Sequence, residues 1–208
     1  VALPRRMWAG SRVDFRAPIA FGAALARTST IADVRNTSGR SGALAIVTVR
    51  HEIRADGALA IVDEHDIVYR EAPAPGEPAA ARRESASRAA QFGRRVAPDP
   101  VLLFRYSALT FNGHRIHYDR DYVTKVEKLP GLVVQSSLIS QLLIEMCRRE
   151  LPARRLTNFD FQNFRSIYDS GGKFALAGTP SADGNSASLW ALDGEGKLSM
   201  LATAKFAT

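Results

Sequence analysis

The amino-acid sequence predicts an α+β fold made of two similar antiparallel sheet units. Three observations lead to this prediction: two strand–turn–strand patterns, a matching segment ahead of each pattern, and one amphipathic helix ahead of the second. The 208 residues are enough for one large domain, or for two small packed units with a real core.

The first strand–turn–strand pattern lies in the N-terminal half. Residues 43–53 are apolar and β-branched, Asp56-Gly57 follow, and residues 59–69 form a second apolar run. An Asp-Gly pair between two such runs is a strong local signal for a β-hairpin.

A similar pattern lies near the C-terminus. Residues 189–192 lead to Asp193-Gly194, and apolar residues then alternate with polar ones over residues 198–206. Val13-Asp14-Phe15 stands ahead of the first pattern and Phe159-Asp160-Phe161 ahead of the second. Because both halves share this order, we infer an internal duplication of an antiparallel sheet unit.

One helix is predicted ahead of the second pattern. Residues 136–149 carry apolar side chains at helical spacing. Ser136 or Ser137 is expected to cap its N-terminus, and Pro152 is expected to stop it. Cys147, the single cysteine, falls in this apolar pattern and is expected to be a small buried residue. A single cysteine excludes an intrachain disulfide.

The stretch between the two halves differs in composition. Residues 72–100 are rich in Ala, Pro, Arg, Glu and Ser, with little apolar periodicity, and are expected to form a surface linker. The predicted domains are therefore an N-terminal unit over residues 1–71 and a C-terminal unit over residues 101–208.

Composition narrows the classes of partner and location. No apolar run reaches the roughly 18 residues needed to span a bilayer, so no membrane partner is expected. The N-terminal residues lack the pattern of a signal peptide, which favours a cytoplasmic location. The net charge of +7 suits either a solvated arginine-rich surface or a phosphate-bearing ligand such as coenzyme A. No nucleic acid is expected, because no basic stripe with interleaved aromatic residues occurs.

The most informative segment is the loop of residues 106–119. It places Asn112, His114, His117 and Asp119 close together, after an expected apolar strand and before a helix. Gly113 is expected to turn the backbone so that Asn112 and His117 are aimed at one point. A histidine can transfer a proton near neutral pH, and an amide can hold a water or a substrate oxygen. Taken alone, the loop fits a polar, hydrogen-bonded turn without catalysis better than a catalytic one.

A second informative segment is residues 130–138, which read as a tight turn followed by a helix start. A helix N-terminus offers free N–H groups and a positive partial charge, so it can stabilise a developing oxyanion. An ordinary capped helix is the alternative. No metal-ligand spacing occurs among the four histidines and the cysteine, so neither a metal nor a cofactor is expected.

Together these two segments resemble the MaoC-type, R-specific enoyl-thioester hydratases. The family motif is Asp-x-Asn-Pro-x-His-x-Asp, followed by His-Gly before the central helix. In this sequence the motif positions are held in turn by Asn112, His114, Arg115, His117 and Asp119, and the His-Gly pair by Gln135 and Ser136. The chain therefore departs from the pattern at the first Asp and at His-Gly.

The amino-acid sequence of residues 104–119 is most similar to one branch of that family. This branch holds the type 2 3-hydroxyacyl-thioester dehydratases and the mesaconyl-CoA and itaconyl-CoA hydratases; residues 5–10 and 39–42 also resemble it. The resemblance implies a double hot-dog fold, with two curled antiparallel sheets and the central helix in the second unit. It further implies that the first unit is truncated at its N-terminus, without its helix and leading strand.

The resemblance also implies a lyase activity that adds water to, or removes it from, an acyl-CoA thioester. Asn112 and His117 would be catalytic, with His117 as the main acid/base, because the amide of Asn112 cannot take a proton. Val134, Gln135 and Ser136 would bind the thioester.

Two further residues are expected to bind substrate. Arg115, or its neighbour Arg120, would meet a second carboxylate if the substrate is mesaconyl-CoA or another C5 dicarboxylic thioester. Asp119 would either orient a histidine or cap a turn. The alternative function is a non-catalytic acyl-thioester-binding or partner subunit, and a homodimer stays open.

Overall fold

The computed structural model describes residues 3, 5–39, 42–71 and 89–207. The chain forms two compact units. Unit 1 comprises Val1–Arg82, Arg155–Gln162 and Thr203–Thr208, and unit 2 comprises Arg83–Arg154 and Asn163–Ala202. Antiparallel strands dominate both units, which confirms the predicted α+β class. The predicted boundaries at residues 71 and 101 stay a prediction.

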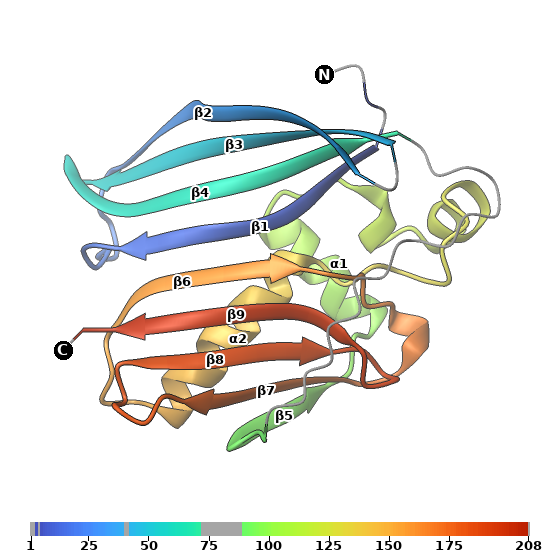
Figure 1. Cartoon of the computed structure of the whole chain (residues 1–208). Helices are drawn as coiled ribbons and strands as arrows, with labels where there is room; N and C mark the ends of the chain where they lie inside the picture. The colour runs from blue at the N-terminus through green and yellow to red at the C-terminus, as the bar shows by residue number, and fades with distance from the viewer. Residues whose placement is uncertain (1–2, 4, 40–41, 72–88, 208) are drawn as a thin grey trace. The chain divides into compact units, whose positions relative to one another are not determined.

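Unit 1 is an antiparallel sheet (Figure 1). Its strands follow the order β2-β3-β4-β1-β6. Their bounds are β1 (Arg5–Phe15), β2 (Leu25–Gly39), β3 (Gly42–Ala55), β4 (Ala58–Arg70) and β6 (Leu156–Asn163).

The β3–β4 hairpin confirms the first predicted strand–turn–strand pattern. Its two turn residues, Asp56 and Gly57, have φ of 48° and 85°. Two positive φ angles in succession are what a two-residue hairpin turn requires, and Asp and Gly tolerate them best. The Asp56 carboxylate also accepts a hydrogen bond from the backbone N of Ala24, at 2.9 Å.

The two matching segments found in the sequence lie on β1 and β6, and these two strands pair with each other. Val13 lies opposite Phe159 and Ser11 opposite Phe161 in antiparallel register. Gly10 is needed at the end of this ladder, because a Cβ there would stand 2.2 Å from the carbonyl oxygen of Phe161. The two copies of the repeated segment thus lie on neighbouring strands of one sheet, although they are far apart in the sequence.

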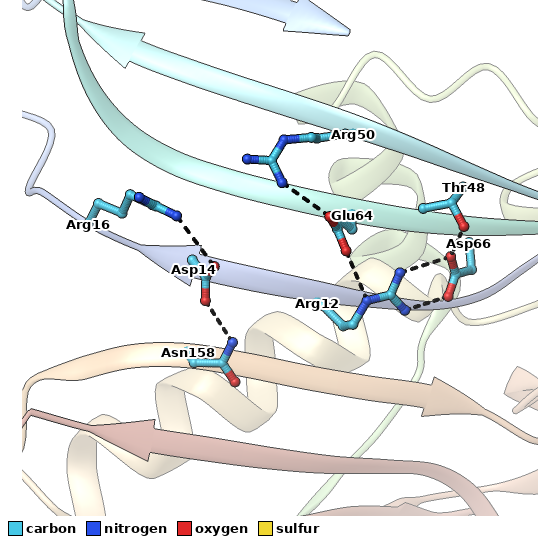
Figure 2. A network of polar contacts seen from close by, with 8 residues as sticks. All are labelled: Arg12, Asp14, Arg16, Thr48, Arg50, Glu64, Asp66 and Asn158. Carbon is cyan, nitrogen blue, oxygen red and sulfur yellow. Dashed lines mark hydrogen bonds and ion pairs between the residues drawn. The ribbon is translucent and has the colours of Figure 1, made fainter. Parts of the chain in front are cut away.

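A network of charged side chains covers one face of the unit 1 sheet (Figure 2). Arg12 on β1 holds Asp66 with both terminal nitrogens, at 2.6 and 3.1 Å, and Glu64 through Nε at 3.2 Å. Thr48 on β3 donates to Asp66 at 2.7 Å, and Arg50 contacts Glu64 at 3.1 Å. Three neighbouring strands are therefore joined by side chains as well as by their backbones.

Unit 2 combines a sheet with the helices (Figure 1). Its strand order is β9-β8-β7-β5, with β5 (Phe92–Val96), β7 (Phe174–Pro180), β8 (Ser186–Leu192) and β9 (Leu198–Phe206). Strand β5 lies inside the stretch expected to be a linker, because Phe92–Val96 pairs in antiparallel register with β7. The rest of that stretch, residues 72–88, lies outside the described residues.

The second predicted hairpin is present as β8 and β9, but its turn is longer than an Asp-Gly pair. Residues 193–197 form the loop, and the Asp193 carboxylate accepts from the backbone N of Glu195 at 3.0 Å and of Lys197 at 2.8 Å. Gly196, not Gly194, takes the positive φ of 81°. The side chain of Asp193 therefore sets the turn.

The predicted helix is α2 (Ser136–Glu150), which packs against β7 and β8 (Figure 1). Its apolar face is buried, including Leu143 and Cys147, and burial raises the pKa of the Cys147 thiol to about 11. The predicted serine cap is wrong. Gln135 holds the N-cap position, and its side chain makes no capping hydrogen bond. No helix in the described part of the chain is long and apolar enough to cross a membrane.

A second helix, α1 (Pro100–Leu109), replaces the apolar strand expected ahead of the loop. Asp99 caps it by accepting hydrogen bonds from the backbone N of Val101 at 2.9 Å and Leu102 at 3.0 Å. Pro100 suits the first helical position, where no N–H donor is required. The Asp99 cap and Pro100 together favour a helix here, although the apolar residues that follow also suit a strand.

Candidate active site

The loop after α1 is turned by Phe111. Its φ is 52°, a left-handed conformation, whereas Gly113 has no positive φ. The turn is held by the backbone N of Asn112, which donates to the carbonyl of Ser107 at 2.9 Å. Phe111 itself is fully exposed.

The side chain of Asn112 stabilises the loop by a local hydrogen bond. Its side-chain oxygen accepts a hydrogen bond from the backbone N of His114, at 3.1 Å. This local bond leaves the side-chain NH₂ group as the polar end that can meet a ligand. No hydrogen bond joins Asn112 to His117 within residues 89–207. The structure therefore places both residues in one short loop without a hydrogen bond between them in this part of the chain.

His117 is buried, with 8% of its surface exposed, and its ring is fixed by the backbone. Nδ1 lies 2.7 Å from the carbonyl oxygen of Val133. A carbonyl oxygen only accepts, so Nδ1 carries the proton and Nε2 of the neutral ring has a free lone pair. The backbone N of Val133 donates in turn to the carbonyl of Ile116 at 3.0 Å, which ties the two segments together.

The surroundings of His117 favour its neutral form. Burial lowers the pKa of His117 below its ordinary value of 6.5, the hydrogen bond to Val133 partly opposes this, and the nearby charge of His114 lowers the pKa further. The two imidazole rings stand edge to face, with centroids 5.6 Å apart. A neutral imidazole with a free Nε2 is a proton acceptor at neutral pH.

The segment before α2 is anchored on both sides. The backbone N of Val134 donates to Ile167 at 2.9 Å, and the backbone N of Leu132 donates to the carboxylate of Asp169 at 2.8 Å. Gly131 is required beside it, because a Cβ there would lie 2.5 Å from Asp169 Oδ1. These bonds fix the helix start next to the Val133 carbonyl that holds His117.

Gln135 is buried at this helix start, with 1% exposed. Its side-chain Nε2 donates to the carbonyl of Leu103 and to the hydroxyl of Ser107, both at 2.9 Å. Two acceptors at one end fix the orientation of the amide. Its Oε1 is buried and accepts no hydrogen bond within the described residues. Gln135 therefore locks α1 to the start of α2.

Ser136 is the first residue of α2, and its side chain is partly exposed. The first N–H groups of a helix have no partner within it, so those of Ser136 and the next two residues point out of the N-terminus. Together with the helix dipole they can bind a developing negative charge.

Arg115 and Asp119 are engaged with each other. Asp119 Oδ2 accepts from Arg115 Nε at 3.0 Å and Nη2 at 2.7 Å, and Oδ1 accepts from the backbone N of Tyr122 at 3.0 Å. The guanidinium lies 4.3 Å from the centre of the Tyr122 ring. Of the two roles expected for Asp119, the structure shows the turn cap. Arg120 is likewise paired with the carboxylate of Asp169.

Sequence reasoning missed the residues that hold the site from behind. Val133 acts through its carbonyl, and Ser107 and Asp169 act through backbone and side-chain oxygens far away in sequence. A carbonyl contact leaves no trace in residue type, so no sequence signal could have revealed Val133. Tyr106, whose hydroxyl bonds to Ser137, was inside the segment singled out but was given no role.

Comparison with known proteins decides the family. The family model described as hydroxyacyl-thioester dehydratase type 2 matches residues 1–169. The chain belongs to this family. It is also 43% identical over 183 residues to the mesaconyl-C(4)-CoA hydratase of Chloroflexus aurantiacus, a match that covers 88% of this chain and 64% of that protein. The chain thus spans less than two thirds of that relative's length.

Solved structures agree on the fold. A MaoC-like dehydratase has a TM-score of 0.77 at 15% identity, covering 99% of this chain and 76% of that one. HtdX of Mycobacterium tuberculosis has a TM-score of 0.71 at 15% identity, covering 96% and 76%. RV0216 of the same organism, described as a double hot-dog fold, has a TM-score of 0.55 at 15% identity, covering 97% and 75%. The double hot-dog fold is confirmed.

Proposed function

We propose that this type 2 hydroxyacyl-thioester dehydratase relative is a carbon–oxygen lyase that hydrates enoyl-CoA thioesters and dehydrates 3-hydroxyacyl-CoA thioesters. The observation that carries the proposal is the fixed tautomer of His117. Its Nδ1 proton is held by the Val133 carbonyl at 2.7 Å, so Nε2 is the basic atom. The family membership and the named activity of the Chloroflexus relative support the same reaction.

In the hydration direction, His117 Nε2 takes a proton from water while the water oxygen forms a bond to the β-carbon. The double-bond electrons move toward the thioester, giving an enolate, and the imidazolium then returns the proton to the α-carbon. The water is thus divided into a hydroxyl on the β-carbon and a hydrogen on the α-carbon, with no oxidant or reductant. Asn112 orients the water through its side-chain NH₂ group.

The start of α2 receives the negative charge of the enolate oxygen. The first N–H groups of the helix, beginning at Ser136, are the donors, and Val134 and Gln135 shape the approach. One such donor typically contributes about 3 kcal/mol to lowering a barrier. Because the donors are backbone groups, a serine in the place of the family's glycine keeps them.

The substrate proposed is an acyl-CoA, and mesaconyl-CoA or a related C5 dicarboxylic thioester is the first choice. This choice rests on the name of the Chloroflexus relative. The arginines expected to meet a second carboxylate are already paired, Arg115 with Asp119 and Arg120 with Asp169. A dicarboxylic substrate would have to compete for one of these two cations. The homodimer and the cytoplasmic location stay predictions.

The test is incubation of folded protein with short, branched and dicarboxylic enoyl-CoAs, with mass spectrometry of the products. A gain of one water in at least one thioester is expected. Binding of acyl-CoA without any mass change across the panel would overturn the proposal and leave the non-catalytic thioester-binding subunit. Neither binding nor turnover would overturn both functions.

A further inference from the structure

Three side chains with metal-binding chemistry meet on the unit 1 sheet. His51 on β3 lies directly opposite Asp63 on β4, and His65 follows two residues further along β4. Side chains two apart on a strand share one face, so all three project from the same side of the sheet. The charged network of Figure 2 uses Glu64 and Asp66, the alternate residues of β4, and therefore occupies the other face.

The ligand atoms of the three residues are within reach of one ion. Each offers one nitrogen or oxygen, and these atoms all lie within 4.8 Å of one another. Asp63 Oδ1 is shielded from solvent and has no hydrogen-bond partner in the described part of the chain. A buried carboxylate oxygen without a partner is costly, and a bound cation is one way to satisfy it.

Both histidines are oriented by neighbours. His51 Nδ1 lies 2.8 Å from the hydroxyl of Ser29 on β2, and a hydroxyl that accepts from Nδ1 leaves Nε2 as the ligand atom. The ring of His65 is stacked on Trp8, with centroids 4.4 Å apart and planes 17° from parallel. A hydrogen bond to the far nitrogen and a packed ring are the usual supports of metal-binding histidines.

We propose that His51, Asp63 and His65 bind one divalent ion of the zinc class. Two imidazoles and one carboxylate suit zinc and similar borderline cations better than calcium or magnesium, which prefer oxygen ligands alone. The three atoms, now within 4.8 Å of one another, would each lie about 2 Å from the bound ion. The ion clips β3 to β4, and the proposed thioester chemistry of unit 2 does not involve it.

Calorimetric titration of zinc chloride into chelator-stripped, dialysed protein tests the site. One ion per chain is expected, with a rise in the thermal unfolding midpoint when zinc is present. Asp63→Asn keeps the side-chain shape but removes the charge, and it is expected to weaken binding at least about tenfold. Ser29→Ala, which frees His51, is expected to weaken it by about tenfold.

His114→Ala is the matched control, since it removes an exposed histidine of unit 2, one of four in the chain. It is expected to bind zinc as the wild type does. Far-UV circular dichroism checks that each variant is folded, and the near-isosteric Asp63→Asn keeps the test valid if Ser29→Ala disturbs the pairing of β2 with β3. The proposal is overturned if the wild type binds no stoichiometric zinc, or if Asp63→Asn and Ser29→Ala bind it as tightly as the wild type.

Discussion

At the scale of single residues, the tautomer of His117 is set by the hydrogen bond that its ring donates. The Val133 carbonyl, 2.7 Å from Nδ1, fixes the tautomer, and burial lowers the pKa of His117 and so favours the neutral ring. A free histidine at the same position would interchange its two tautomers and titrate near its ordinary pKa. The backbone of the segment before α2 therefore orients the residue that we propose as the base.

The pH dependence of activity follows from this arrangement. Hydration needs unprotonated Nε2, so kcat/KM is expected to be level at neutral pH and to fall as the pH drops through the pKa of His117. Because burial, and then His114, lower this pKa, the fall lies below pH 6.5. In His114→Ala the contribution of His114 is gone, so the fall is expected to shift to higher pH.

The measurement is a pH profile of initial rates for the wild type and for His114→Ala. Arg148→Ala, which removes an exposed cation from α2, is the control and should leave the profile in place. A profile that does not move in His114→Ala would contradict the assigned surroundings of His117.

The residue types of the candidate site were predictable from sequence, but the hydrogen bonds that hold those residues in place were not. His117 and Asn112 stand out because histidine and asparagine gather in one loop beside a glycine. Sequence reasoning gave the turn to Gly113 alone, whereas Phe111 takes a left-handed φ of 52°. A backbone hydrogen bond from the N of Asn112 to the carbonyl of Ser107 holds that turn, and a bond between main-chain atoms cannot be seen in residue types.

At the scale of elements, the site depends on how α1 meets the start of α2. Gln135 reaches from the N-cap of α2 to Leu103 and Ser107 of α1. Sequence reasoning placed α2 correctly because its apolar spacing is regular over many residues. It mistook α1 for a strand, because a run of apolar residues as short as this one does not separate helix from strand.

Replacing Gln135 tests this join. Gln135→Ala removes two buried hydrogen bonds, and unfolding in urea is expected to require about 2 kcal/mol less free energy. Gln141→Ala, an exposed glutamine of the same helix, is expected to change it by less than about 0.5 kcal/mol. Equal stability of the two variants would show that the join between α1 and α2 contributes nothing.

At the scale of the whole molecule, the two units share strands. Strand β9 runs from Leu198 to Phe206, with residues up to Ala202 in unit 2 and residues from Thr203 in unit 1. One continuous strand cannot unfold in one unit and stay intact in the other without fraying. We therefore expect a single cooperative unfolding transition that responds to changes in either unit.

The charged network of unit 1 provides a probe for this transition (Figure 2). Burial opposes the ionisation of Asp66, but hydrogen bonds from Arg12 and Thr48 outweigh it, so the pKa of Asp66 falls below its ordinary 3.8. A lowered carboxyl pKa adds stability above pH 3.8, and this is lost as the pH falls through the folded-state value.

Arg12→Ala is therefore expected to lower the unfolding free energy at pH 7 by roughly 1 kcal/mol, since Arg12 is partly exposed and screened. The loss should shrink as Asp66 becomes protonated. Arg16→Ala removes a looser pair, 4.0 Å from Asp14, and serves as the control with a smaller effect. Urea unfolding at several pH values measures both; an Arg12→Ala loss that is the same at pH 7 and in acid would contradict the role of Asp66.

The overall fold was largely accessible from sequence, through the repeated hairpins and the family resemblance. What could not be predicted is how distant strands face each other. His51, Asp63 and His65 have no metal-ligand spacing in the sequence, and only the register of β3 against β4 brings them together.

The central claim is that His117 is the base of a hydration reaction, and the most direct measurement compares wild-type protein with His117→Ala. Initial rates are followed at the enoyl-thioester absorbance band with mesaconyl-CoA and crotonyl-CoA, with circular dichroism to confirm that both proteins are folded. We predict turnover by the wild type and a loss of roughly 10²–10⁴-fold in the variant. A folded His117→Ala that hydrates either thioester at the wild-type rate would contradict the account.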